Sequence, residues 1–164
     1  MRAHNLARKP DPLVAMYTQA RAFAESSQQA YQNGLTRTPT NILSVAPFVV
    51  NSAFSIELYL KGLHRSYGKT EKTGHSLHKL YRELPGKCRK GIEVLFSKVC
   101  EARNCDKEKR LEVILKEHDL AFVEWRYLHE KEKTGRIQVE YMVASVIALD
   151  DYLGAMIKGK KGAT

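Results

Sequence analysis

SVAPFVVNSAFSIELYLKGLHRSY, residues 44–67, is the stretch that decides the fold. Pro47 falls in its first turn, where a helix tolerates proline, and apolar residues then recur every three or four positions. They form two stripes, Val49, Ala53, Ile56, Leu60 and Leu63 on one side and Val50 and Phe54 on the other. A helix that is apolar on more than one side is buried among other helices. We therefore predict a central helix from about Ser44 to Tyr67.

The same periodicity continues outward in both directions. Before the central helix, Asp11-Pro12 is typical of an N-cap followed by proline, and Asn33-Gly34 indicates where that first helix ends. After the central helix, four helical segments are expected: Ser76–Leu84, Lys87–Ala102, Asp106–Lys131 with a candidate break at His118-Asp119, and Val139–Ile157. The sequence therefore predicts an all-α fold of about five to six helices.

No repeat or linker divides the 164 residues, so we expect a single helical domain over residues 1–164. Its core should span about 11–157, followed by a flexible basic tail at 158–164. Hydrophobic residues make up 43% of the chain, which excludes disorder over most of its length. The longest uninterrupted apolar stretches are too short for a membrane span, and the first ten residues contain no apolar signal core. The expected location is the cytoplasm.

The three cysteines are an odd number with no Cys-x-x-Cys pair, which is typical of a reduced compartment. The formal net charge of +9 is concentrated in one segment. Between Lys61 and Arg110 there are 14 basic and six acidic residues, a net charge of +8. Such a segment favours phosphate-bearing partners, although a solvated helical face has the same composition.

Two blocks carry a resemblance to a known family. Ala53-Phe-Ser-Ile-Glu-Leu-Tyr-Leu-Lys-Gly-Leu63 is followed by Gly74-His-Ser-Leu-His-Lys-Leu-Tyr-Arg-Glu-Leu-Pro85. Together they resemble the HEPN superfamily, and Phe122-Val-Glu-Trp-Arg-Tyr-Leu-His-Glu130 is similar to a later helix of some of its subfamilies. The resemblance covers roughly residues 12–155. It implies an antiparallel helical bundle, often a homodimer, found in defence systems, in toxin–antitoxin pairs and beside nucleotidyltransferase partners.

The best-known activity of that superfamily is metal-independent RNA cleavage by an Arg and a His separated by four to six residues. The chemistry needs a His to move a proton at the ribose hydroxyl and an Arg to stabilise charge on the phosphate. This chain departs from the spacing, because Arg126 and His129 are separated by two residues and Arg110 and His118 by seven. Arg126 and His129 do share a helix face, so a rearranged catalytic pair is an alternative.

Glu57 is the first candidate for a polar site, because a buried carboxylate has to be paired or neutralised. One possible partner is Arg126, which would create a polar centre inside the bundle. The other is Lys61, one helical turn away on a partly exposed face. Glu130, four residues after Arg126, is a candidate either for ligand binding or for a structural ion pair with that arginine.

His75 and His78 lie one turn apart beside Lys79. Zinc would need two further ligands that the cysteine spacing does not supply, so neither a metal nor another cofactor is expected. His75 is instead expected to cap or pack at a helix N-terminus, a position that also suits an anion. Lys61, His75 and Lys79 would then surround a polar centre formed by Arg126 and His129 and supported by Glu57.

Three functional hypotheses follow. The leading one is a HEPN-like helical module that binds nucleotide or RNA without catalysis, in a defence or toxin–antitoxin context, as a homodimer or with a protein such as a nucleotidyltransferase. The second is a divergent metal-independent endoribonuclease that uses Arg126 and His129. The third is a protein-interaction or regulatory subunit with no nucleic-acid role.

Overall fold

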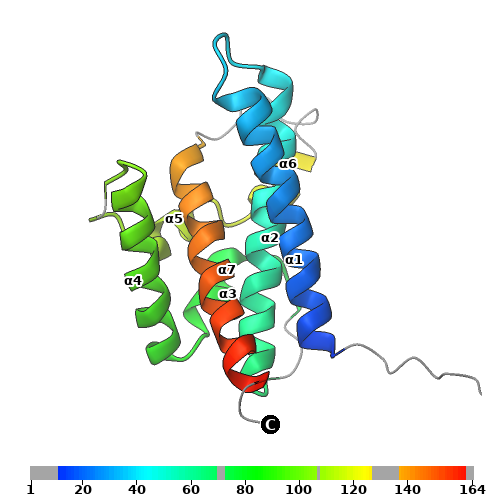
Figure 1. Ribbon diagram of the computed structural model, residues 1–164, viewed down its shortest axis with the longest axis vertical. Coiled ribbons are helices and arrows are strands. Elements are labelled where there is room, and N and C mark those ends of the chain that lie inside the picture. The colour runs from blue at the N-terminus through cyan, green and yellow to red at the C-terminus, as the bar shows by residue number, and fades with distance from the viewer. Residues whose placement is uncertain (1–10, 70–72, 107, 127–136, 162–164) are drawn as a thin grey trace, which may run out of the picture.

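A computed structural model of the chain describes residues 11–69, 73–106, 108–126 and 137–161. No β-strand occurs among these residues. The helices are α1 (Pro12–Ala30), α2 (Val45–Ser66), α3 (Leu77–Arg82), α4 (Gly86–Ala102), α5 (Leu111–Glu117), α6 (Ala121–Arg126) and α7 (Val139–Lys161), as Figure 1 shows. A π-helical turn at Tyr31–Leu35 and a 3₁₀ turn at Ile42–Ser44 connect α1 to α2. The all-α prediction is confirmed.

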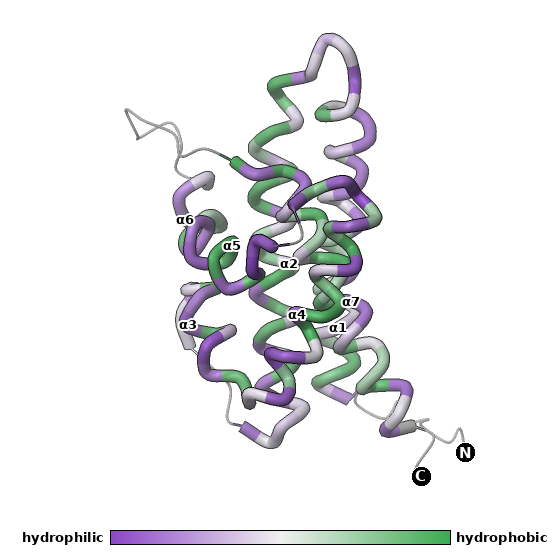
Figure 2. The backbone as a smooth tube through the Cα atoms, turned by 90° about the vertical axis from the view of Figure 1, so that its left-hand side faces the viewer, coloured by the Kyte–Doolittle hydropathy of each residue, from purple (hydrophilic) through white to green (hydrophobic). Residues whose placement is uncertain are grey.

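The four long helices α1, α2, α4 and α7 form the body of the bundle. In Figure 1, α1 and α4 run in one direction and α2 and α7 in the other. α2 packs on α1, α7, α3 and α6, whereas α4 packs mainly on α7. The short helices α3, α5 and α6 gather on one side of this body (Figure 2).

α2 is the central helix, as its two apolar stripes predict. Thirteen of its 22 residues are buried. Small residues let α1 approach closely: Ser55 Oγ donates to the Ala20 carbonyl at 2.9 Å, and the Ser27 and Ser52 hydroxyl groups are hydrogen-bonded to each other. These contacts satisfy hydroxyl groups that would otherwise be costly to bury.

The turn at Ile42–Ser44 and α2 together form a helical stretch, Ile42–Ser66, whose average composition is strongly apolar although polar residues interrupt it. By length and composition alone it could cross a membrane, and half of its most apolar window is buried inside the bundle. No other helix among the described residues meets this criterion. Packing against four neighbouring helices requires the same composition, so burial in the core accounts for the apolar character of this helix.

The C-terminal ends of α1 and α7 differ from the prediction. Asp11 caps α1 by accepting the Leu13 N–H at 2.8 Å, as expected, but Asn33-Gly34 does not end the helical path. It lies within the π-helical turn, where a Cβ on Gly34 would be 1.9 Å from Ser44 Oγ, so close packing requires the glycine there. At the other end of the chain, α7 continues past Ile157 to Lys161, and Lys160 Nζ donates to the Ser66 carbonyl at 3.0 Å.

The segment predicted as a helix from Asp106 begins instead at Leu111. Asp106 forms a local turn by accepting the Glu108 N–H at 2.9 Å. The first amides of α5 are held by Glu93 of α4, whose carboxylate accepts the Leu111 N–H at 3.1 Å. A capping group from another helix therefore sets where α5 begins, and no local pattern can reveal it. The candidate break at His118-Asp119 is confirmed, since it separates α5 from α6.

Candidate functional site

A buried ion-pair cluster lies where α2 meets the turn that precedes α3. Glu57 is only 1% exposed, in keeping with the expectation that this carboxylate is buried. Lys61 Nζ donates to Glu57 Oε1 at 2.7 Å, and His75 Nδ1 lies 3.1 Å from both carboxylate oxygens. The structure thus pairs Glu57 with Lys61, one of its two candidate partners, and adds His75, which sequence spacing did not suggest.

The hydrogen bond to Glu57 orients the His75 ring. An ionised carboxylate only accepts hydrogen bonds, so Nδ1 donates and carries the proton. The other ring nitrogen, Nε2, is then an acceptor in the neutral imidazole and a donor in the imidazolium. The His75 side chain is 53% exposed, whereas that of Glu57 is 2% exposed. The imidazole ring therefore lies at the surface and is hydrogen-bonded to a carboxylate buried beneath it. This arrangement presents one ring nitrogen for contact with a ligand.

The start of α3 is built by Ser76 and Asp119. Ser76 is the N-cap and accepts the Lys79 N–H at 3.1 Å, while its hydroxyl donates to the Asp119 carboxylate at 2.8 Å. Asp119 also accepts the His78 N–H at 2.7 Å. Of the two roles expected for His75, capping falls to Ser76 instead, and His75 packs beside the helix N-terminus against Glu57. The same carboxylate occupies the position where the sequence suggested an anion.

A pocket of about 370 Å³ opens beside His75, and we call it the α2–α3 pocket. Its lining consists of Thr73, Gly74, His75, Ser76, Lys79, Leu80 and Glu83. Lys69 reaches the same place, because its Nζ donates to the Glu83 carbonyl at 2.7 Å. The pocket thus brings together His75 and Lys79. Lys61 is linked to it indirectly, because Glu57 contacts both Lys61 and His75.

Aromatic rings connect this site to the core. Phe23 and Phe54 meet edge to face at 4.5 Å, and Phe54 stacks on Phe122 of α6 at 4.6 Å. The Phe122 ring is 6.0 Å from that of His75. α6 is therefore fixed against α2 beside the ion-pair cluster. Trp125 of the same helix is partly buried against the core.

The remaining candidates lie at or beyond the end of α6. The backbone of Arg126 forms the last residue of that helix, but its side chain lies outside the described residues. His129 and Glu130 also lie outside them. A pairing of Arg126 with Glu57, and a catalytic pair of Arg126 and His129, therefore remain predictions.

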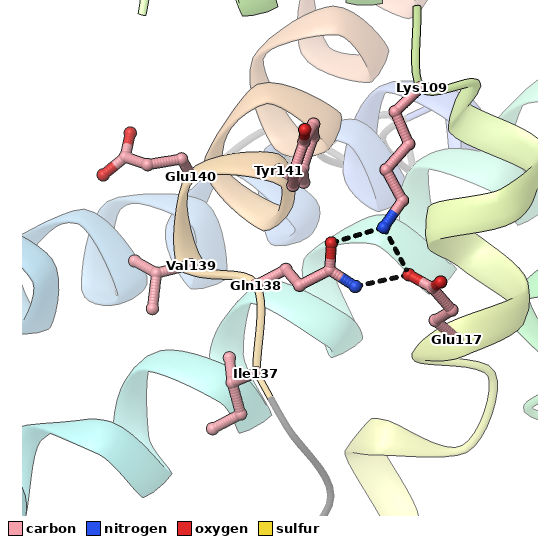
Figure 3. A pocket seen from close by; sticks show the side chains of 7 residues that line it. All are labelled: Lys109, Glu117, Ile137, Gln138, Val139, Glu140 and Tyr141. Atoms are coloured by element: carbon pink, nitrogen blue, oxygen red, sulfur yellow. Dashed lines mark hydrogen bonds and ion pairs between the residues drawn. The ribbon is translucent and has the colours of Figure 1, made fainter. Parts of the chain in front are cut away.

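A second polar cluster joins α5 to the start of α7 (Figure 3). Lys109 Nζ lies 3.0 Å from Glu117 and donates to Gln138 Oε1 at 2.6 Å, while the Gln138 amide donates to Glu117. The hydrogen bond from Lys109 is the main cause of a lowered pKa for the Glu117 carboxyl group. These residues line a cavity of about 880 Å³ and satisfy one another, which indicates a structural clasp. No group of three or more metal-ligating side chains occurs in the described part of the chain.

With this geometry in place, comparison with known proteins adds one result. The family model described as HEPN domain matches residues 14–151. The chain belongs to the HEPN family. Neither a curated protein nor a solved structure was found to match it.

The match confirms the family and the helical bundle for this HEPN domain, and it suggests a role connected with nucleotides or RNA. It spans both blocks that carry the resemblance, together with the ion-pair cluster. Sequence reasoning missed Asp119 and the stacked pair Phe54 and Phe122. The break at His118-Asp119 was the only local signal for Asp119, and aromatic residues on apolar helix faces are ordinary core residues.

Proposed function

We propose that this HEPN domain binds RNA or a nucleotide through phosphate at the α2–α3 pocket and does not cleave it. The observation that carries the proposal is that His75 and Lys79 line one pocket while buried Glu57 holds the imidazole from below. Oriented donors beside a cation are what a phosphate oxygen requires. Glu130 of the segment after α6 belongs to the proposal as a further ligand-binding candidate.

The charge balance of the pocket supports an anionic ligand. The negative charge of Glu57 is matched by the Lys61 ammonium at 2.7 Å, so the carboxylate adds little repulsion. Glu83 is the acid in the pocket lining. Lys79 lines the pocket, Lys69 lies at its edge, and both side chains are exposed. Lys79 and Lys69 together outweigh Glu83, so the local charge is positive, which attracts phosphate.

Binding of a fluorescein-labelled ten-nucleotide single-stranded RNA, followed by anisotropy at several salt concentrations, tests the proposal. Each phosphate contact adds about −0.7 to the slope of log K against log salt for single strands. Lys79→Gln should lower the magnitude of that slope by about 0.7, and His75→Gln should weaken binding at low salt. Lys158→Gln, an exposed lysine of α7, is the matched control. Salt-independent binding, or binding unchanged by Lys79→Gln, would refute the proposal.

Cleavage by Arg126 and His129 is the second candidate function. What favours it is the position of α6, which fixes the backbone of Arg126 next to the helix that carries Glu57. It predicts products with a 2′,3′-cyclic phosphate in the presence of EDTA. Our proposal predicts intact RNA under the same conditions. Cleavage that disappears in both Arg126→Ala and His129→Ala would replace non-catalytic binding by this activity.

The family resemblance also supports proposals about partners. We place the protein in the cytoplasm, as a homodimer or beside a protein such as a nucleotidyltransferase, in a defence or toxin–antitoxin context. Light scattering of the purified chain tests the homodimer. A stoichiometric protein partner that co-purifies without nucleic acid would instead favour the regulatory-subunit hypothesis.

A further inference from the structure

A second basic groove lies between α4 and the segment that leads into α5. Its volume is about 780 Å³. Three cationic side chains line it: Arg89 and Lys90 of α4, and Arg110 just before α5. The Arg110 side chain is 64% exposed; it donates a long hydrogen bond to Glu112 at 3.4 Å and lies 3.9 Å from Glu93. Ion pairs as exposed as these contribute little to stability.

Glu93, one of two acidic residues in the lining, is already engaged. Its carboxylate accepts the Tyr81 hydroxyl at 3.0 Å, the Leu111 N–H at 3.1 Å and the Glu112 N–H at 3.4 Å. These three donors stabilise the negative charge of Glu93 within the protein. The carboxylate therefore neutralises the positive charge of the neighbouring arginines less than a carboxylate without these hydrogen bonds would. Glu108 at the rim is exposed and is the other acid.

Arg89 supplies an independent sign of a ligand. Its Nε atom is buried and has no hydrogen-bond partner among the described residues. A buried donor left without an acceptor costs about 1–3 kcal/mol, so such groups are rare unless something else satisfies them. The guanidinium fork matches the oxygens of a phosphate, which can accept two of its N–H groups at once.

We infer that the groove of Arg89, Lys90 and Arg110 binds a phosphate group and forms a second anion site of this domain. The site stands without the α2–α3 pocket, but α3 connects the two. Lys79 lines the first pocket, and Arg82, three residues later on α3, lies 3.7 Å from Glu112, which Arg110 also contacts. Two cations of α3, Lys79 and Arg82, thus lie between the two sites, and α3 packs on α5. The phosphate source that fits two linked sites is the backbone of an oligoribonucleotide.

Two titrations of the intact chain test the inference, one with inorganic phosphate and one with a ten-nucleotide single-stranded RNA. Backbone amide shifts in NMR spectra report the phosphate site, and fluorescence anisotropy reports RNA affinity. Lys90→Gln and Arg110→Gln change exposed side chains and leave the core intact. Arg89→Lys keeps the charge but removes the buried Nε donor. Glu108→Gln removes the rim acid, and Lys116→Gln on α5 is the matched control.

Phosphate should shift amides around Arg89, and each of Lys90→Gln and Arg110→Gln should lower the salt slope of RNA binding by about 0.7. Arg89→Lys should weaken phosphate binding severalfold, Glu108→Gln should strengthen it, and Lys116→Gln should do neither.

Phosphate binding with no gain in affinity for RNA would support the site and assign it to free phosphate. Unchanged slopes together with absent phosphate shifts would overturn it, as would equal competition by polyglutamate, which would assign the groove to an acidic protein. Loss of RNA binding in Lys79→Gln alone, with no phosphate shifts around Arg89, would leave the proposed function standing and refute this inference. Loss of RNA binding in the groove variants alone would do the reverse.

Discussion

At the scale of single residues, Glu57 determines the chemistry of the candidate site. It is the most deeply buried carboxylate among the described residues, and its oxygens contact Lys61 and His75 at the same time. Lys61 keeps 17% of its side chain exposed. The cluster therefore lies between core and surface, with its negative charge inside and its cations directed outward. Because of this arrangement, the buried Glu57 carboxylate orients cationic side chains at a surface that we propose binds anions.

Removing Lys61 should be costly, because it leaves the Glu57 carboxylate buried with His75 as its remaining partner among the described residues. We expect Lys61→Met to lower the free energy of unfolding by about 3 kcal/mol, measured by urea denaturation. The double variant Glu57→Leu/Lys61→Met should recover most of that loss, since a buried pair can often be replaced by apolar residues at little cost. A loss below about 1 kcal/mol in Lys61→Met would show that Glu57 does not depend on this lysine.

At the scale of elements, α3 depends on a residue far from it in the sequence. Asp119, between α5 and α6, accepts hydrogen bonds from the Ser76 hydroxyl and the His78 amide. Its own carbonyl accepts the Leu77 N–H at 3.3 Å. A six-residue helix has little intrinsic stability, so this external cap keeps Lys79 in place beside His75.

Asp119→Ala should therefore loosen α3 more than the rest of the bundle. We expect a loss of about 1–2 kcal/mol in stability, typical of a lost helix cap. Hydrogen exchange should become faster at the α3 amides while those of α2 stay protected. Asp151→Ala, an exposed acid of α7, is the control and should change neither. Equal acceleration in α2 and α3 would contradict a local capping role.

At the scale of the whole molecule, polar clasps join helices that apolar packing alone would leave free to slide. Lys109, Glu117 and Gln138 connect the α5 region to the start of α7. Arg103 of the segment after α4 binds Glu140 of α7 at 2.7 Å, and Glu140 also accepts the Tyr31 hydroxyl at 2.7 Å. Such networks specify one arrangement of the bundle, because each group is satisfied only in that arrangement.

The Glu117 clasp should give the fold a component of acid sensitivity. Its pKa is lowered from 4.5, chiefly by the hydrogen bond from Lys109, so its stabilising effect is present above pH 4.5 and is lost as pH falls through the lower folded value. Glu117→Gln should reduce stability at pH 7 by a few tenths of a kcal/mol, because the side chain is 41% exposed. Urea denaturation at pH 7 and pH 3 should show this deficit shrinking in acid. A deficit that is constant with pH, or the same shrinkage in the exposed control Glu25→Gln, would contradict the linkage.

The helices and the central position of α2 could be predicted from sequence, because apolar periodicity and caps such as Asp11 act between neighbours along the chain. The burial of Glu57 was also predictable from its place in α2. The start of α5 was not, since Glu93 supplies its first hydrogen bonds from 18 residues away. Sequence therefore determined which segments are helical, that α2 lies at the centre, and the family.

Only the tertiary structure decided the site. It assigned Lys61 and His75 to Glu57, brought Asp119 to a helix 41 residues earlier, and left the Nε donor of Arg89, a residue of the basic groove, without a hydrogen-bond partner among the described residues. The physical reason is that charges and hydrogen bonds pair through space. The sequence contains several residues that could pair with a given charged or polar group, and the packing of the helices selects one of them.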